Sequence, residues 1–324
     1  DYALPEAESA SVGERVVVPL GARRKDVGII VRVKDETAVP ENKLRQAVKV
    51  FHDVDPLSSE WLSFTRFAAD YYVKPWGEAA VPALPLFFRS TPKKLYEKSL
   101  ERLRTQHAKP GNPVERVRLN EEQQAAVDAV ISTEGYACFL LFGVTGSGKT
   151  EVYLHIIEQT LKKFPQGQVL LLVPEINLTP QLEARVRGRF VDELFVTMHS
   201  GLPPNERAKS WLAVHEGRAR VLVGTRMSVM TSFKSLKLVI VDEEHDLSYK
   251  AGEGLRFSAR DLAVKRALDN AVPCVLGSAT PSLETWAKAQ SGAYKLLRLT
   301  HRAVSSAALP AMELVDVSHR KPRV

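Results

Sequence analysis

The sequence predicts an α/β protein in which a lobe built on a parallel β-sheet follows a small β-rich domain. From Leu119 onward, short and wholly apolar runs alternate with segments of helical periodicity. This pattern is typical of a parallel sheet covered by helices on both faces. A glycine-rich turn directly follows the first of these runs. The expected strands of the lobe are residues 138–142, 169–173, 194–198, 220–223, 238–241 and 274–277.

The N-terminal part of the chain has a different pattern. Short β-branched runs are separated there by Gly, Pro and charged residues, which indicates strands joined by turns. A stretch of helical apolar periodicity follows behind Ser58, a residue type that caps helices. We therefore expect a β-rich domain over residues 1–88. Its expected strands are residues 15–21, 27–33 and 46–51, and its expected helix is 58–73.

Residues 89–118 join the two parts and are strongly basic. They carry nine basic and three acidic side chains, whereas residues 1–88 carry 11 basic and 13 acidic ones. A basic stretch attracts phosphodiester backbones by releasing condensed counterions. A solvated linker helix is the alternative interpretation of the same charges.

The composition excludes several classes of protein. The 324 residues are 44% hydrophobic and 26% charged, with a net charge of +7, which is ordinary for a globular chain. No apolar run approaches the roughly 18 residues of a membrane helix. The chain lacks an initiator Met and a signal-like start, so we expect a trimmed N-terminus and a cytoplasmic protein without a membrane partner. Cys138 and Cys274 lie in apolar runs and are expected to be buried thiols of a reducing compartment.

The segment "GVTGSGKT" matches the pattern G-x-x-x-x-G-K-[ST] between an expected strand and an expected helix. Its glycines let the backbone fold tightly, so that N–H groups can cradle phosphates. Lys149 is expected to reach the β- and γ-phosphates, and the Thr150 hydroxyl to ligate Mg²⁺. The expected nucleotide-binding residues of this turn are Gly143, Val144, Thr145, Gly146, Ser147, Gly148, Lys149 and Thr150.

A second motif, "LVIVDEEHD", places carboxylates at the end of an apolar strand. Asp242 suits a Mg²⁺ ligand, because ligands of parallel sheets bind at the carboxyl ends of the strands. Glu243 follows and is placed to orient or deprotonate an attacking water. A solvated acidic turn is the alternative. The two motifs together predict a nucleotide hydrolase using ATP and Mg²⁺, with Lys149, Asp242 and Glu243 as catalytic residues.

Seven segments resemble, in order and wording, the PriA family of bacterial primosomal replication-restart helicases within superfamily 2. They are "GVTGSGKTEVYL", "LLLVPEINLTPQ", "HSGLPPNER", "VGTRMSV", "VIVDEEHDLSYK", "RFSARDLAVKRA" and "LGSATPSLET". The resemblance is specific over residues 119–302 and weaker at the N-terminus. It implies a RecA-like first helicase lobe in a 3′ to 5′ ATP-dependent DNA helicase. It also implies that such a protein recognises stalled forks and initiates primosome assembly, with single-stranded DNA-binding protein, primosome proteins, and forked and single-stranded DNA as partners.

The resemblance assigns functions to residues of the lobe. "LNEEQQ" resembles the adenine-contacting Q motif and points to Gln123. His245 would join the catalytic set, and with Ser278 and Thr280 it would couple the nucleotide state to DNA movement. Taken singly, each residue has a local alternative, such as a turn histidine or a helix cap. The residues that would grip single-stranded DNA are Thr179, Gln181, Thr225 and Arg226.

Residues 246–261 interleave aromatic and basic side chains, the components of a surface that stacks bases and meets phosphates. The family has an aromatic-rich loop here that links DNA contact to hydrolysis. The alternative is a loop whose aromatic side chains anchor it to the core. The residues expected to contact DNA are Tyr249, Lys250, Arg256 and Phe257.

The N-terminal domain of the family captures the 3′ end of a nascent leading strand. The matching positions are Asp1, Gly21 and Arg45. A glycine allows close backbone approach, and a cation suits a terminal phosphate.

The chain departs from the family twice. The family has a winged-helix domain before the helicase, but residues 89–118 are too few for one, so it is reduced or missing. Beyond residues 303–324, which would begin the connection, we expect a second lobe with an arginine motif and a zinc-binding insertion; the basic run 318–323 lacks that pattern. We therefore expect weak ATPase activity from this chain alone. Two alternatives stay open: another superfamily 2 DNA translocase in repair, or a fork-binding, partner-loading module in which hydrolysis is dispensable.

Overall fold

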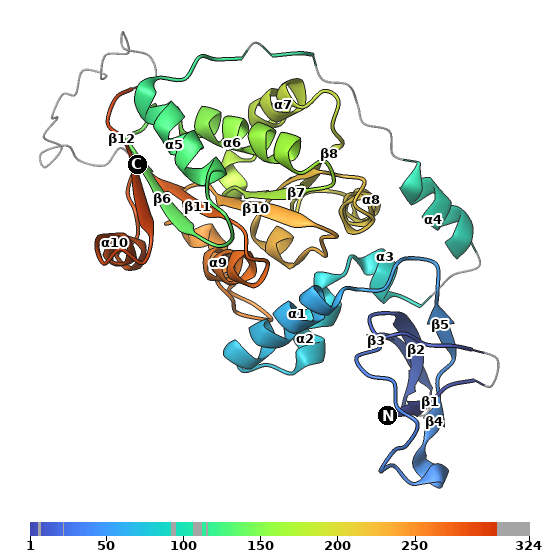
Figure 1. The fold of residues 1–324 in the computed structure, drawn as a ribbon. Coiled ribbons are helices and arrows are strands. Elements are labelled where there is room, and N and C mark those ends of the chain that lie inside the picture. The colour runs from blue at the N-terminus through green and yellow to red at the C-terminus, as the bar shows by residue number, and fades with distance from the viewer. Residues whose placement is uncertain (6–7, 22, 92–94, 106–111, 115, 303–324) are drawn as a thin grey trace, which may run out of the picture.

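A computed structural model of the chain describes residues 1–5, 8–21, 23–91, 95–105, 112–114 and 116–302. A small β-rich part and a larger sheet lobe are arranged side by side, with short helices between them (Figure 1). The expected connection at residues 303–324, including its basic run, lies outside the described residues.

The lobe is built on one parallel sheet. Within the described part of the chain it has seven strands in the order β12-β6-β11-β10-β7-β9-β8, all parallel. The strands are β6 (Cys138–Gly143), β7 (Gln168–Leu172), β8 (Phe195–Met198), β9 (Val221–Gly224), β10 (Leu236–Val241), β11 (Cys274–Ser278) and β12 (Lys295–Leu299). The α/β prediction is confirmed. The sequence pattern missed β12, because an edge strand can keep charged side chains such as Lys295 and Arg298 outside the core.

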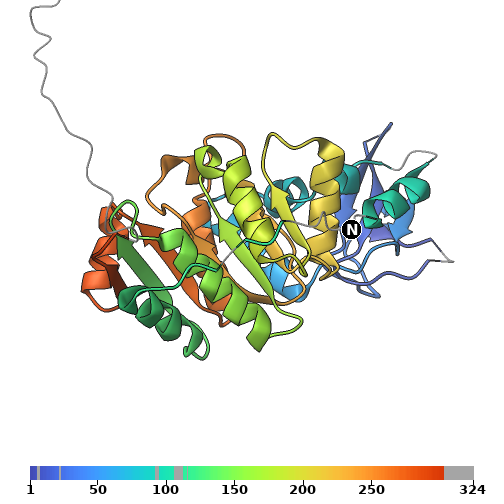
Figure 2. The same ribbon diagram turned by 90° about the horizontal axis from the view of Figure 1, so that it is seen from above.

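Helices cover both faces of this sheet (Figures 1 and 2). Along β10, Leu238 and Ile240 pack with the helices of one face, and Val239 and Val241 with those of the other. Successive residues of a strand point to opposite faces, so a strand buried on both sides must be apolar throughout. One face carries α5 (Glu121–Ile131), α6 (Lys149–Lys163) and α7 (Pro180–Arg189); the other carries α8 (Pro204–His215), α9 (Ala259–Asp269) and α10 (Leu283–Gln290).

The β-rich part holds two small sheets at the opposite end of the molecule from β12 (Figure 2). The strand expected at residues 27–33 is wrong in its span, because β3 begins before Val27 and ends at Ile29. A tight turn through Gly21, whose φ is +61°, brings β3 back against β2. An antiparallel sheet contains β2 (Arg15–Leu20), β3 (Arg24–Ile29) and β5 (Lys49–Phe51); β1 (Tyr2–Ala3) and β4 (Arg45–Gln46) form a parallel pair.

Four helices connect the two parts: α1 (Ser59–Tyr71), α2 (Trp76–Ala83), α3 (Leu86–Arg89) and α4 (Tyr96–Arg104). Ser58 caps α1 as predicted, accepting a hydrogen bond from the backbone N–H of Trp61 at 3.2 Å. These helices share their core with the lobe: Phe64 of α1 joins the sheet's apolar cluster, and Leu103 of α4 packs in one cluster with Trp211 of α8. These helices thus contact both the β-rich part and the lobe, and part of the basic linker is the docked helix α4; the expected domain boundary at residue 88 stays a prediction.

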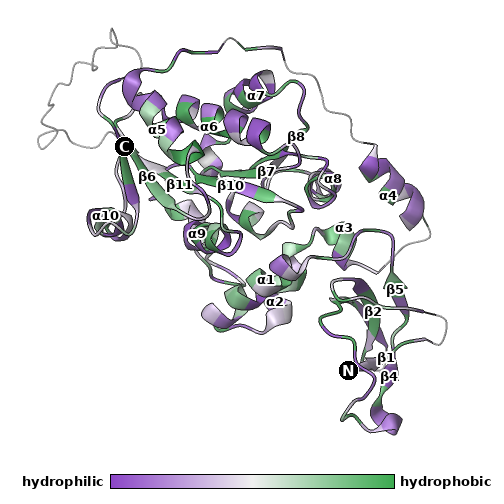
Figure 3. Ribbon diagram, in the orientation of Figure 1, coloured by the Kyte–Doolittle hydropathy of each residue, from purple (hydrophilic) through white to green (hydrophobic). Residues whose placement is uncertain are grey.

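The apolar residues concentrate in the sheet strands, whereas α4 is mostly hydrophilic on its outer side (Figure 3). Cys138 and Cys274 are opposite each other on β6 and β11, and both are buried free thiols as predicted. A hydrogen bond with Cys138, together with burial, raises the pKa of the Cys274 thiol. Among the described residues, no helix combines the length and apolar character that crossing a membrane requires.

Candidate nucleotide-binding and DNA-binding sites

The loop between β6 and α6 has the geometry of a phosphate cradle. Gly146 and Gly148 have φ values of +81° and +84°, which residues with side chains rarely adopt. A Cβ atom at Gly143 would lie 2.5 Å from Ser147 Oγ, so the loop closes tightly at that point. The loop thus turns directly into the N-terminus of α6, where backbone N–H groups and the helix dipole favour an anion.

Polar groups around this loop fit a bound triphosphate. Ser147 Oγ is buried without a hydrogen-bond partner. Lys149 is buried; its Nζ donates to the Gly143 carbonyl at 3.2 Å and lies 3.4 Å from Glu243 Oε1. The Lys149 ammonium group therefore already lies beside the loop. Phosphate oxygens can replace the Gly143 carbonyl and the Glu243 carboxylate as its partners. Thr150 follows it in the first turn of α6 and is half-buried, while Val144 and Thr145 are exposed on the loop.

Asp242 lies at the carboxyl end of β10, beside the same loop. Its backbone N–H donates to the Leu172 carbonyl, and its Oδ1 accepts a 3.0 Å hydrogen bond from Tyr153 Oη of α6. Burial, reinforced by the charge of Glu243, raises the pKa of Asp242 to about 6. A divalent cation offsets such a penalty, because it supplies the missing positive charge. The Mg²⁺ site predicted at Asp242 and Thr150 stays a prediction.

Glu243 is held in an unusual conformation at the mouth of the site. Its φ is +43°, in the left-handed region that non-glycine residues rarely occupy. The carboxylate lies 3.4 Å from Lys149 Nζ and 3.7 Å from His245 Nδ1. The side chain is 27% exposed, so a water molecule can reach it. This placement suits the predicted base.

His245 lies beside Ser278 and Thr280, although 33 and 35 positions separate it from them in sequence. His245 Nδ1 shares a 2.7 Å hydrogen bond with Ser278 Oγ, and its Nε2 lies 3.3 Å from Thr280 Oγ1. The imidazole therefore links the end of β10 with the end of β11. A coupling function for these three residues stays a prediction.

Sequence reasoning missed Glu244, the most connected residue of the motif. Its side chain is fully buried, with Oε1 accepting from the Ser282 N–H at 2.7 Å. Its Oε2 accepts from Thr285 Oγ1 at 2.9 Å and pairs with Arg260 Nη1 at 3.1 Å. Glu244 thereby fastens the residue after the predicted base to the starts of α9 and α10. The residues next to Glu244 in the sequence do not reveal this structural function, because its hydrogen-bond partners are distant in sequence.

Gln123 lies under the phosphate loop. Its Nε2 donates to the Ser147 carbonyl at 2.8 Å, and its Oε1 accepts from the Asn120 N–H at 3.0 Å. Asn120 returns the contact by capping α5, so the two residues form a reciprocal capping box. Both ends of the Gln123 amide are therefore engaged with backbone. The predicted adenine contact would require one of these two bonds to be exchanged.

The four residues expected to grip single-stranded DNA are placed differently from one another. Thr179 caps α7, accepting from the Leu182 N–H at 3.3 Å, which confirms the local alternative of a helix cap. Gln181 is exposed on the first turn of α7, whereas Thr225 is buried. Arg226 Nη1 donates to the carbonyls of Ser248 and Lys250 at 2.8 and 3.1 Å. In this structure the Arg226 guanidinium holds the aromatic-rich loop in place.

The structure corrects the prediction that Tyr249 and Phe257 stack on bases. Their side chains are 1% and 3% exposed and belong to the apolar cluster of the sheet. Tyr249 Oη also donates to the Asp242 carbonyl at 2.6 Å. The aromatics anchor the loop, whereas the cations Lys250 and Arg256, two of the four residues expected to contact DNA, face solvent. The alternation of aromatic and basic residues in the sequence could not decide between a core anchor and a base-stacking surface. Both use the same aromatic side chains.

A buried arginine donates hydrogen bonds to the backbone at the end of the short 3₁₀ helix Arg226–Met230. Arg266 of α9 is fully buried, and its Nη1 donates to the two carbonyls that flank Met230, at 2.7 and 2.5 Å. Trp61 Nε1 of α1 donates to the carbonyl of Met230 at 2.7 Å. Glu60 of α1 neutralises Arg266 at 3.1 Å. Side chains from α1 and α9 thus fix three successive carbonyls of the segment that carries Arg226.

Asp1, Gly21 and Arg45 gather at one exposed edge of the β-rich part. Arg45 Nη1 donates to the Gly21 carbonyl at 2.5 Å. Pairing of β1 with β4 puts Tyr2 opposite Arg45, which brings Asp1 to the same edge. The Asp1 carboxylate pairs with Lys34 Nζ at 2.5 Å. Capture of a 3′ end at this edge stays a prediction.

The sheet order, phosphate loop and strand-end carboxylates define a nucleotide-dependent helicase lobe. The chain belongs to the DEAD/DEAH box helicase family, whose family model matches residues 120–289. A second family model, the PriA 3′ DNA-binding domain (3′BD), matches residues 1–85. That match extends through α1 and α2, which the structure packs against the helicase lobe.

Curated proteins similar to this chain include replication restart proteins named PriA. The protein of Bacillus subtilis is 45% identical over 202 residues, covering 61% of this chain and 25% of that protein. Those of Haemophilus influenzae and Rickettsia felis are both 34% identical, over 380 and 322 residues; they cover 95% and 99% of this chain, and 51% and 47% of their own lengths. Among solved structures, RecG bound to a three-way DNA junction covers 76% of this chain and 30% of its own, with a TM-score of 0.45 and 20% identity.

Proposed function

We propose that this chain provides the 3′-end-binding part and first motor lobe of an ATP-dependent DNA helicase that moves 3′ to 5′. In this proposal the whole protein recognises stalled replication forks and initiates primosome assembly in the bacterial cytoplasm, at the nucleoid. Its partners are forked and single-stranded DNA, single-stranded DNA-binding protein and primosome proteins. The observation that carries the proposal is the order of two family models in one chain, the PriA 3′ DNA-binding domain before the DEAD/DEAH box helicase.

The chain spans about half the length of the Haemophilus and Rickettsia relatives it matches. We assign the remaining parts of the mechanism to the unmatched half of such proteins, including a second lobe with the arginine that stabilises phosphoryl transfer and a zinc-binding insertion. Within the described residues, no group of three or more His, Cys, Asp or Glu side chains is arranged to hold a metal ion. The proposed Mg²⁺ site therefore relies on phosphate oxygens beside Thr150 and Asp242.

The alignments with the two relatives differ in length. The alignment with the Haemophilus protein has 380 positions against 324 residues, so at least 56 positions lie opposite gaps in this chain. The alignment with the Rickettsia protein has only 322 positions over 99% of the chain. We propose that a winged-helix domain is missing between α4 and α5, as the shortness of residues 89–118 suggests.

The chemistry follows from the placement of the chain's own groups. Bound Mg²⁺ supplies charge to the phosphate oxygens and neutralises Asp242. The loop N–H groups and Lys149 bind and orient the phosphates. Glu243 accepts a proton from the attacking water while Lys149 and His245 hold its carboxylate at the mouth of the site. Glu244 keeps the backbone of Glu243 in register with α9 and α10.

Phosphate release by the full-length protein tests this function and separates the alternatives. We expect turnover to be stimulated more by forked and single-stranded DNA than by duplex DNA. Equal stimulation by all three DNAs would favour a general repair translocase. Fork binding and partner loading that persist fully in a hydrolysis-deficient variant would favour the loading module. Residues 1–324 alone are expected to bind nucleotide and to hydrolyse it slowly, because an arginine donated from outside the loop contributes about 10³–10⁵ in rate.

A further inference from the structure

Glu151 lies one residue beyond the phosphate loop and connects it to α7. It belongs to the first turn of α6, where its backbone N–H donates to the Gly148 carbonyl at 2.9 Å. Its carboxylate is buried, and each oxygen meets a different arginine of α7. Oε2 pairs with Arg185 Nη2 at 2.8 Å, and Oε1 pairs with Arg189 Nη1 at 3.0 Å. The Glu151 side chain thereby connects the residue next to the loop directly to α7.

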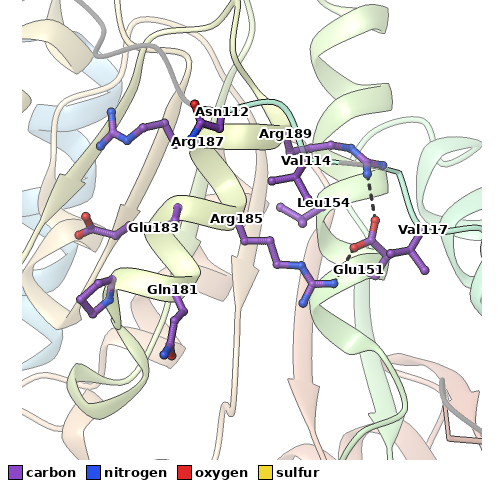
Figure 4. A pocket seen from close by; sticks show the side chains of 12 residues that line it. Asn112, Val114, Val117, Glu151, Leu154, Gln181, Glu183, Arg185, Arg187 and Arg189 are labelled. Atoms are coloured by element: carbon purple, nitrogen blue, oxygen red, sulfur yellow. Dashed lines mark hydrogen bonds and ion pairs between the residues drawn. The ribbon is translucent and has the colours of Figure 1, made fainter.

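A pocket of about 790 Å³ lies at this level and is lined by residues of both helices, while Leu154 of α6 and Val186 of α7 belong to one apolar cluster. Figure 4 shows Arg185 reaching from α7 toward Glu151 on α6, with Gln181 one turn before it on α7. Residues 112–114 and 116–118 form a strap along the pocket, since the Val114 N–H donates to the Gly188 carbonyl at 3.1 Å. Near Glu151, the ion pairs of Arg185 and Arg189 add to this packing in holding the two helices in register.

The two arginines are not equivalent. Arg189 is 4% exposed and also pairs with Glu158 of α6 at 3.1 Å, so it is a fixed anchor. Arg185 is 43% exposed and pairs with Glu151. Its ion pair is the one that can open into solvent. Phosphate charge held by Lys149, two residues from Glu151, changes the field at this carboxylate.

We infer that Glu151 is a positioning residue that couples nucleotide binding at the loop to single-strand binding at the start of α7. The nucleotide sets the strength of the Glu151–Arg185 pair, and that pair sets the orientation of the α7 N-terminus, where Thr179 and Gln181 lie. The inference rests on the proposed function, because it requires both ligands to bind this lobe. Coupling between two sites is reciprocal, so it can be measured from either ligand.

The test is a binding cycle on the 324-residue chain. The dissociation constant of a fluorescent oligo-dT is measured by anisotropy with and without a non-hydrolysable ATP analogue and Mg²⁺. We expect the nucleotide to change the wild-type constant about fivefold or more, the lower end of typical coupling. In Glu151→Gln and Arg185→Ala the factor should fall to within about twofold of one, while each ligand alone binds within about threefold of wild type. Arg185→Lys should restore part of the factor, since an ammonium can re-form one ion pair.

Lys209→Ala is the matched control, because it removes an ion pair with Glu206 that lies within α8 and involves neither α6 nor α7. It should keep the wild-type factor. Thermal unfolding verifies that all variants fold. If the buried substitution Glu151→Gln unfolds the chain, Arg185→Ala still tests the ion pair, because the Arg185 side chain is 43% exposed. A wild-type coupling factor preserved in both Glu151→Gln and Arg185→Ala would overturn the inference, as would a coupling factor of one in the wild-type chain when both ligands bind. A wild-type chain that binds neither ligand would instead refute the proposed function.

Discussion

Replacing Glu60 by Gln tests whether α1 is part of the helicase lobe. Arg266 has no exposed surface, and Glu60, at 3.1 Å and 25% exposed, is its charged partner. Removing one member of a fully buried pair costs about 3–5 kcal/mol. Because Glu60 is partly solvated and Gln keeps one acceptor, we expect a loss of about 2–3 kcal/mol. For a unit of this size that corresponds to a fall in Tm of roughly 4–12 °C.

The assay is thermal unfolding followed by far-UV circular dichroism. Asp70→Asn is the matched control on the same helix, because the Asp70–Arg66 pair is 60% and 56% exposed. Such exposed pairs contribute about 0.3–0.5 kcal/mol, so its Tm should change by about 2 °C or less. Equal Tm values for the two variants would refute the reasoning and would place α1 outside the cooperative unit of the lobe.

Three further predictions concern ligands. Lys149→Ala should abolish ATP binding in a folded chain, because the cation of the cradle is lost; calorimetry showing wild-type affinity would contradict it. In the full-length protein, Glu243→Gln should keep ATP and Mg²⁺ binding but lower turnover by about 10²–10⁴, since shape is kept and the base is removed; near-normal phosphate release would place the base elsewhere. The wild-type chain should bind a fork with a free 3′ end more tightly than one whose 3′ end carries a phosphate, and Arg45→Ala should lose this preference; indifference of the wild type in an electrophoretic shift assay would exclude the pocket.

The sequence predicted the parts of the fold that depend on local pattern. Strands buried on both faces must be apolar throughout, so runs such as 238–241 were visible, and Ser58 marked the start of α1. The phosphate loop and the strand-end carboxylates were also visible, because their chemistry requires particular residues next to each other. The edge strand β12 escaped notice, since one side of it needs no apolar residue.

Contacts between distant segments could not be predicted in the same way. Glu60 and Arg266 are 206 residues apart, and the sequence around neither residue predicts that they pair. Glu244 lies in a recognised motif, yet its partners Arg260 and Ser282 come from two other helices' starts. Tyr249 and Phe257 show the reverse case: the local sequence suggested a DNA-binding surface, but both side chains are buried in the core. Burial is a property of the assembled fold, so residue type alone leaves it open.

The paired thiols of β6 and β11 have a practical consequence for spectroscopy. Cys138 and Cys274 are the only cysteines of the 324 residues, and each has at most 2% of its surface exposed. Thiolate is the reactive form; burial keeps reagents from both thiols, and the raised pKa of Cys274 also suppresses its thiolate in the native protein. A cysteine introduced on the exposed side of α7 or the β-rich part would therefore react selectively with a maleimide dye. Distances between the two parts can then be followed by fluorescence energy transfer without first removing the native thiols.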